Sequence, residues 1–287
     1  MSEELLKTRT GQFPIGFRDC LADSLIWARG NRFAAVDLVA DVAVKRDQAL
    51  REGIAVGAAD LAGWRELITA DEDRRRAAVG AATDFIRESP RDPPPIFLTI
   101  MLPEEPDRAR RENFDFMVSA YSGLVETLEE CDARLVIEGW PGPGAQCCTP
   151  ETLRAFFKAC PSERIGVNFD PSHLLRMGID PIRFLHEFSN RVYHMHAKDT
   201  EFITENLYVF GHEQMPTFAE KIRHGAAAWR YAIPGHGCAR WTDMFQVLND
   251  SGYNGYVSIE LEDSNFFETE DDKKTALTLA AQYLAGC

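Results

Sequence analysis

Four side chains that can bind a divalent metal lie at the ends of four short segments with the alternating pattern of β-strands. They are Glu138 in RLVIEGW, Asp170 in IGVNFDPSH, His196 in VYHMHAKD and Glu260 in YVSIELED. Successive strand side chains point to opposite faces, so residues two apart share a face. In each segment one parity is apolar and the other leads to the candidate ligand. The four residues are therefore expected to form one site.

The chemistry of this set is that of a metal-dependent proton transfer. Two glutamates, one aspartate and one neutral histidine suit Mn²⁺, Mg²⁺ or Co²⁺, and Zn²⁺ is also compatible. A bound metal would polarise a carbonyl or acidify a hydroxyl, and a carboxylate nearby could move a proton at carbon. Glu138 and Glu260 come from nonadjacent strands, so one could remove a proton from one face of a substrate and the other return it on the opposite face. Each residue alone is more often a solvated strand end or a helix cap, so the interpretation depends on all four.

Further candidates surround these four residues. His173, three residues after Asp170, could reach the metal, the substrate or a bound water, or it could cap the following helix. Lys198 could contact a substrate oxygen and Asp199 could orient a histidine, although a surface ion pair is equally compatible with both. Trp140, two residues after Glu138, is a further substrate-binding candidate. His194 shares the inward face with His196 one layer deeper, where a buried, hydrogen-bonded role is expected.

Short apolar runs alternate with longer amphipathic stretches, which is typical of repeated βα units around a parallel sheet. Strands are predicted at roughly residues 14–17, 34–39, 53–57, 95–100, 134–138, 164–170, 191–196 and 255–261. Helices are predicted over segments that include 71–88, 112–131, 149–160 and 241–252.

Eight such units predict a single (β/α)₈ TIM barrel over residues 1–287, with its active site at the C-terminal ends of the strands. The four candidate ligands fall at these ends. A doubly wound α/β sheet is the alternative, but no G-x-G-x-x-G follows the first strand.

One connection, residues 198–239, is unusually long for a compact domain. Such loops are often lids or binding segments. Its aromatic residues and histidines, His236 among them, could close over a ligand. Packing against a second copy in a homo-oligomer is the other interpretation, because aromatic residues also favour interfaces.

Composition excludes several classes of function. The net charge of −14, from 31 Lys and Arg against 45 Asp and Glu, argues against nucleic acid as a partner. Seven cysteines without a C-x-x-C suggest neither a disulfide framework nor a thiolate zinc site, which favours a cytoplasmic location. There is no apolar run long enough to span a bilayer and no signal-peptide core, so no membrane association is expected.

Several of these motifs together resemble the xylose isomerase-like barrel superfamily, and within it the sugar phosphate isomerase/epimerase group. They are I-E at strand five, D-x-x-H at strand six, H-x-K-D at strand seven, a later P-G-x-G and G-Y-x-G-Y-x-S-I-E-x-E-D at strand eight. The resemblance covers residues 13–263 and is most specific from residue 134 onward. It implies one divalent metal, commonly Mn²⁺, on Glu138, Asp170, His196 and Glu260. It also implies that the two glutamates are the acid/base pair and that His173 contacts substrate.

The sequence departs from the ketose 3-epimerases of this group, which typically have an arginine shortly after the strand-seven histidine. Here that region reads AKDTEFITEN, and H-x-K-D is closer to the dehydratase and uncharacterised members. The expected function is a metal-dependent isomerase or epimerase acting on a sugar or cyclitol through an enediolate. A lyase or dehydratase is the alternative, with His173 or His236 as the acid. An endonuclease IV-like nuclease and a non-catalytic barrel are the rivals from other classes.

Overall fold

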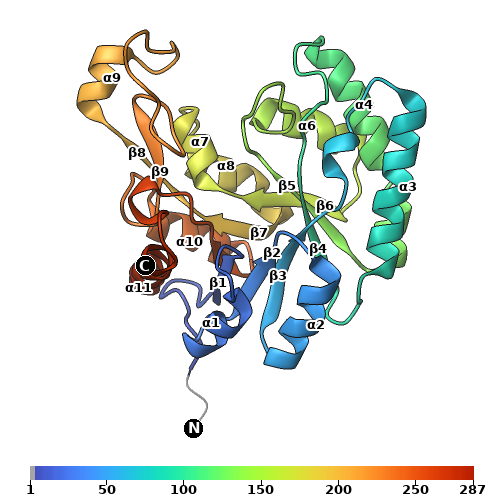
Figure 1. Cartoon of the computed structure of the whole chain (residues 1–287). Coiled ribbons are helices and arrows are strands. Elements are labelled where there is room, and N and C mark those ends of the chain that lie inside the picture. Colours follow the sequence, from blue (N-terminus) through green and yellow to red (C-terminus); the bar gives the residue numbers. More distant parts are fainter. Residues whose placement is uncertain (1–3) are drawn as a thin grey trace.

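Eight parallel strands close into a barrel in the computed structural model, which describes residues 4–287 (Figure 1). The order around the barrel is β1-β10-β7-β6-β5-β4-β3-β2. The bounds are β1 Ile15–Arg18, β2 Ala35–Leu38, β3 Ala55–Asp60, β4 Ile96–Ile100, β5 Arg134–Glu138, β6 Ile165–Phe169, β7 Val192–Ala197 and β10 Val257–Ile259. The predicted (β/α)₈ barrel is confirmed, with β10 as its eighth strand along the chain.

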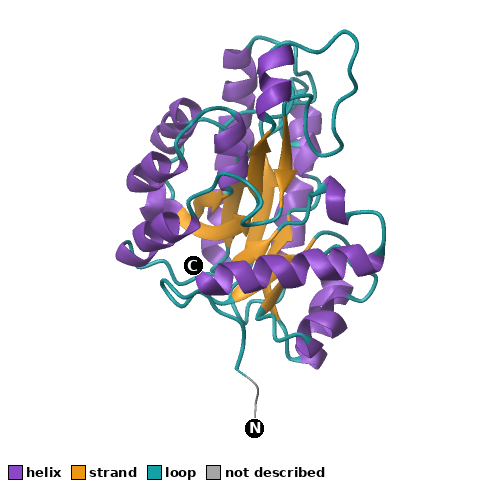
Figure 2. Cartoon of the chain, turned by 90° about the vertical axis from the view of Figure 1, so that its left-hand side faces the viewer, coloured by secondary structure: helices purple, strands orange, loops and turns teal. Residues whose placement is uncertain are grey.

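Helices surround the barrel strands (Figure 2). They are α1 Ser24–Gly30, α2 Val42–Glu52, α3 Glu72–Glu88, α4 Arg110–Ser122, α5 Val125–Glu130, α6 Pro150–Ala159, α7 Pro171–Arg176, α8 Pro181–Phe188, α9 Thr204–Phe210, α10 Trp241–Asp250 and α11 Glu270–Gly286. Short 3₁₀ turns lie at η1 Trp64–Glu66, η2 Ser189–Arg191 and η3 Ser264–Phe266. No helix in the described part of the chain has the length and apolar character needed to cross a bilayer.

The strand residues follow the predicted parity. Leu135 and Val167 of the apolar parity belong to the main hydrophobic core. On the other parity, Leu98 pairs with Val136, and Ala58, Leu98 and Val136 form a small cluster of their own. One step further toward the C-terminal end, Ile100 pairs with Glu138. Alternation therefore places Glu138 at the mouth of the barrel, directly above a filled apolar layer.

Strand β3 differs from the prediction of residues 53–57, because it runs from Ala55 to Asp60. Gly53 is the C-cap of α2, with a φ of 68°, rather than a strand residue. A left-handed residue at this position is the usual end of a helix, and glycine adopts it without steric cost. The shift brings Asp60 to the last position of the strand, on the rim where the candidate ligands lie.

The segment 198–239 is not a structureless loop. It contains a two-stranded antiparallel sheet, β8 Asp199–Phe202 and β9 Trp229–Ala232, with α9 between its strands. In Figure 1 these elements extend beyond the barrel beside α7, and β8 contacts α7. The segment thus adds a small second sheet at the edge of the barrel mouth.

Asp199 anchors the segment 198–239. Its buried carboxylate accepts hydrogen bonds from the backbone N–H groups of Thr200 (2.8 Å), Ala239 (2.9 Å) and Gly235 (3.3 Å). It also accepts one from the indole Nε1 of Trp241 (3.0 Å). Burial raises the pKa of Asp199, and these four donors oppose that rise. The Asp199 side chain therefore fixes the loop before α10. It does not orient a histidine or contact a ligand, as the sequence had suggested.

Asp199→Ala is expected to lower the free energy of unfolding by about 2–4 kcal/mol, because it leaves several buried donors unpaired. Urea denaturation followed by circular dichroism measures this change. Asp243→Ala, at an exposed aspartate of α10, is the matched control and should change stability by less than about 0.5 kcal/mol. Equal effects of the two substitutions would contradict the anchoring role.

Candidate active site

The four candidate ligands converge at the mouth of the barrel. Glu138, Asp170, His196 and Glu260 each offer an atom within 4.8 Å of those of the others. Glu138 ends β5, Asp170 follows β6, His196 lies on β7 and Glu260 follows β10. The Nδ1 atom of His196 lies 2.9 Å from Glu138 Oε2 and 3.4 Å from Glu260 Oε2. The geometry that the sequence predicted for this set is therefore present.

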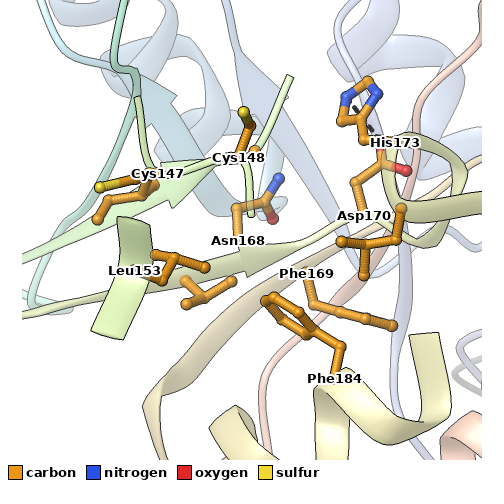
Figure 3. Close-up of a pocket in the computed structure, with 12 residues that line it drawn as sticks. Cys147, Cys148, Leu153, Asn168, Phe169, Asp170, His173 and Phe184 are labelled. Atoms are coloured by element: carbon orange, nitrogen blue, oxygen red, sulfur yellow. Dashed lines mark ion pairs between the residues drawn. The ribbon is translucent and has the colours of Figure 1, made fainter. Parts of the chain in front are cut away.

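Asp170 is held by the helix that follows it. Its Oδ1 accepts hydrogen bonds from the backbone N–H (2.8 Å) and the hydroxyl (2.6 Å) of Ser172, so the carboxylate caps α7. Pro171 at the first helical position lacks an N–H and favours this start. Figure 3 shows Asp170 and His173 at this end of β6. The other oxygen, Oδ2, is buried without a hydrogen-bond partner and remains available as a ligand.

Unpaired buried atoms also mark the site as suited to a cation. Nδ1 of His196 and Oδ2 of Asp170 are buried without a hydrogen bond. Such atoms are rare in native structures unless a water or an ion satisfies them. Burial opposes the protonated form of His196, but Glu138 and Glu260 outweigh it and raise the pKa of the ring well above its usual value. Three carboxylates around one imidazole form a donor set that fits a divalent metal.

Lys198 provides a positive charge within this acidic cluster. Its Nζ lies 2.5 Å from Glu260 Oε2, 2.8 Å from Glu262 Oε2 and 3.3 Å from Asp170 Oδ2. The side chain is 1% exposed, and the ammonium lies 4.5 Å from the centre of the Tyr231 ring. Burial opposes the charge, but the surrounding carboxylates, Asp170 first, raise the pKa of Lys198 well above its usual value. The lysine is thus a fixed cation.

His173 connects Glu138 to the added sheet. Its Nε2 lies 2.8 Å from Glu138 Oε1, and its Nδ1 lies 2.7 Å from the hydroxyl of Tyr231 on β9. Asn168 donates from Nδ2 to the other oxygen of Glu138 at 2.6 Å. Both oxygens of this carboxylate therefore have defined partners, and the histidine is held from both sides.

Glu260 has a different environment, with partners that its sequence motif does not predict. Arg18, the last residue of β1, places its Nε 3.2 Å from Glu260 Oε1. The same guanidinium forms two hydrogen bonds, of 2.8 and 2.9 Å, with the carboxylate of Asp60. Burial opposes ionisation of Glu260, but the charge of Lys198 outweighs it and lowers the pKa of this carboxyl. Arg18 and Asp60 are each the last residue of a barrel strand, and this position together with the alternation of residues could have placed both at the mouth of the barrel.

A cavity of about 350 Å³ opens above these residues. One part of its wall is charged and includes Arg18, Glu138, His173, Lys198 and Glu260. The part beside β3, β4 and β5 is formed mainly by apolar and aromatic side chains, namely Trp64, Leu98, Ile100, Leu102 and Trp140. Its size is within the range of small-molecule sites.

The sequence-predicted substrate contacts divide into two groups. Lys198 and Trp140 border the cavity. Asp199 is held by the four donors of its own loop, and His236 is exposed, with its ring 6.0 Å from that of Phe266. The structure does not bring Asp199 or His236 to the cavity. Both follow the point where the chain leaves the barrel for the added sheet.

Comparison with known proteins agrees with this architecture. The profile of the xylose isomerase-like TIM barrel family matches residues 50–284. The chain belongs to this family. The expected resemblance is therefore confirmed, and the strand-end cluster lies where barrels of this architecture place their active sites.

Two curated relatives of this xylose isomerase-like chain match about half of it. The uncharacterized protein YfiH of Bacillus subtilis (strain 168) is 31% identical over 152 residues, 52% of this chain and 47% of that protein. An inosose dehydratase of Clostridium beijerinckii is 25% identical over 151 residues, 53% of this chain and 48% of that protein. The chain thus spans about half the length of the curated relatives it matches.

Solved structures match nearly the whole xylose isomerase-like chain. A D-tagatose 3-epimerase-like protein has a TM-score of 0.66 at 20% identity and covers 94% of this chain and 97% of its own. The IolI protein with a bound zinc atom has a TM-score of 0.68 at 14% identity, with 95% and 98% covered. A xylose isomerase-like barrel from Mycobacterium smegmatis in complex with magnesium has a TM-score of 0.63 at 14% identity, with 95% and 97% covered. At these identities the similarity establishes a shared fold.

Proposed function

We propose that this protein is a divalent-metal-dependent isomerase or epimerase acting on a small polyhydroxylated carbonyl compound, a sugar or a cyclitol. The observation that carries the proposal is that two glutamates, Glu138 and Glu260, belong to one set of candidate ligands and have different partners. A divalent cation held by these glutamates, Asp170 and His196 would supply Lewis-acid polarisation of neighbouring substrate oxygens. Mn²⁺ is the metal we expect, and Mg²⁺, Co²⁺ and Zn²⁺ fit the same donors.

The two glutamates would act as base and acid in turn. One removes the proton alpha to the carbonyl, which gives an enediolate, and the other returns a proton. Glu260 contacts two permanent cations, Arg18 and Lys198, which disfavour its protonated form. Glu138 contacts the amide of Asn168 and the imidazoles of His173 and His196 instead, none of which is a permanent cation. We therefore assign the first proton abstraction to Glu138.

A lyase or dehydratase is the second candidate, and the position of His173 favours it. This ring contacts both Glu138 and the Tyr231 hydroxyl, so it offers a second proton carrier beside the proposed base. An elimination needs such a carrier to protonate the departing oxygen. The inosose dehydratase relatives are consistent with this alternative.

The nuclease and the non-catalytic barrel receive less support. A nuclease would need a basic surface for phosphates, which a net charge of −14 does not favour. A barrel without activity would have no need of four convergent ligands beside a cavity.

Deuterated water distinguishes the two reactions. The protein would be incubated with Mn²⁺ and a panel of ketoses, inososes and 3-keto-glycosides, and the products analysed by NMR and mass spectrometry. Deuterium at carbon without loss of water or of an aglycone indicates isomerisation or epimerisation, whereas loss of either group indicates a lyase. Metal-free protein is the control. If protein that holds Mn²⁺ produces neither outcome with any compound of the panel, both assignments are contradicted.

A further inference from the structure

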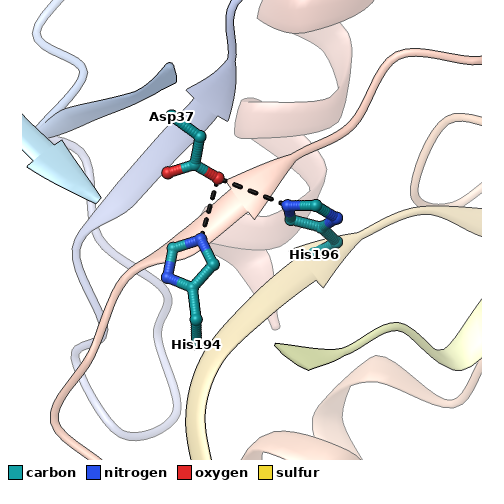
Figure 4. Close-up of side chains that lie close together, drawn as sticks. All are labelled: Asp37, His194 and His196. Atoms are coloured by element: carbon teal, nitrogen blue, oxygen red, sulfur yellow. Dashed lines mark hydrogen bonds and ion pairs between the residues drawn. The ribbon is translucent and has the colours of Figure 1, made fainter. Parts of the chain in front are cut away.

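A second buried cluster shares His196 with the candidate metal ligands, and its other two members have no place in the proposed reaction. It consists of Asp37 on β2 with His194 and His196 on β7 (Figure 4). All three are fully buried. Asp37 Oδ2 lies 2.8 Å from His194 Nε2 and 3.4 Å from His196 Nε2. An aspartate without solvent contact needs such partners, because an isolated buried carboxylate is strongly unfavourable.

The two nitrogens of His196 have different neighbours. Nδ1 lies near Glu138 and Glu260, whereas Nε2 lies near Asp37. Only Nδ1 can therefore bind a cation together with the glutamates. A neutral imidazole has one protonated and one unprotonated nitrogen, so a proton on Nε2 is the condition for Nδ1 to act as a ligand.

We infer that Asp37 is a positioning residue that accepts the Nε2–H of His196 and so holds Nδ1 unprotonated and directed at the metal site. This inference rests on the metal site of the proposed function. Carboxylates placed behind a ligating histidine fix its tautomer and orientation and increase its strength as a ligand. Asp37 thus affects the metal through the imidazole, without contact to the cation or the substrate.

The neighbouring strand is shaped around this carboxylate. The backbone N–H of Ala58 donates to Asp37 Oδ1 at 2.9 Å. A Cβ on Gly57 would lie 2.3 Å from the same oxygen, so glycine leaves the space that Asp37 occupies. The β3 backbone therefore fixes one oxygen, and the other faces the two histidines.

Binding of Mn²⁺ to Asp37→Asn tests the inference by calorimetry, apart from any activity. The substitution keeps the size of the side chain and removes its charge, and we expect the dissociation constant to rise about 10- to 100-fold. His194→Gln is the matched control. It changes the other partner of Asp37, leaves His196 intact and should keep an affinity close to that of the wild type. An unchanged constant in Asp37→Asn, or equal losses in both variants, would overturn the inference.

A second measurement does not depend on how the variants fold. In Zn²⁺-loaded wild-type protein labelled with ¹⁵N-histidine, the His196 ring should show metal coordination at Nδ1 and a proton on Nε2. Coordination through Nε2 would refute the role of Asp37 while leaving the metal site itself intact. Wild-type protein that binds neither Mn²⁺ nor Zn²⁺ would instead refute the metal site of the proposed function and this inference with it.

Discussion

Glu138→Gln and Glu260→Gln are each expected to lower turnover about 10²- to 10⁴-fold, the usual contribution of a positioned acid or base. Glutamine keeps the shape of the side chain and one oxygen ligand, but it cannot carry the proton. The two carboxylates act in successive proton transfers of one reaction, so the double variant should be little slower than the single variants. Steady-state kinetics on the substrate found in the panel, with metal content measured in the same samples, checks this expectation.

Glu201→Gln is the matched control for these variants. Glu201 lies on β8 and forms an ion pair with Arg230 at 2.7 Å, outside the residues that line the cavity. Its substitution should leave turnover near the wild-type value. Full activity in Glu260→Gln protein that still holds its metal would rule out the two-carboxylate mechanism.

Lys198→Met is expected to destabilise the metal-free protein by about 3–5 kcal/mol, the usual loss when one partner of a buried ion pair is removed. Without the ammonium, Asp170, Glu260 and Glu262 repel one another. A divalent cation can replace the lost charge, so Mn²⁺ should raise the melting temperature of the variant far more than that of the wild type. Its affinity for Mn²⁺ should also increase, because the competing ammonium is gone.

Thermal unfolding with and without Mn²⁺ measures both effects. Lys274→Met is the control, because Lys274 is only partly buried and lies 4.0 Å from Glu270 on the surface of α11. Its loss should cost less than about 1 kcal/mol and should not depend on metal. Equal responses of the two variants to Mn²⁺ would show that Lys198 and the cation do not share the same carboxylates.

The alternation of residues was sufficient to predict the barrel and the convergence of its four strand-end candidate ligands. Parity is a local property that survives folding, and strand ends in a closed parallel barrel share one rim. The same rule does not extend past the end of a strand. Asp199 and His236 follow β7, where the chain enters the added sheet, and their surroundings depend on that change of direction.

The partners of the ligands were beyond prediction for a different reason. Arg18 and Asp60, or His173 and Tyr231, meet only because the barrel and the added sheet bring distant segments together. Asp37 lies in the apolar run AAVDLVA, where a charge gives no local indication of its partner. The predicted strand at residues 53–57 does not reach Asp60, because Gly53 ends α2 and the strand runs from Ala55 to Asp60.

The barrel closes between its first strand, β1, and its last strand, β10, so the candidate metal site is completed late in synthesis. Glu260 follows the last barrel strand, so it leaves the ribosome after Glu138, Asp170 and His196. Arg18 lies on β1, which has no partner on that side until β10 is made. Domains fold as units once their sequence is available, and contacts between the chain's two ends are slow to form. A nascent chain that stops before β10 therefore carries an open barrel with three of the four candidate ligands, and the proposed metal site is complete only once β10 and Glu260 have joined it.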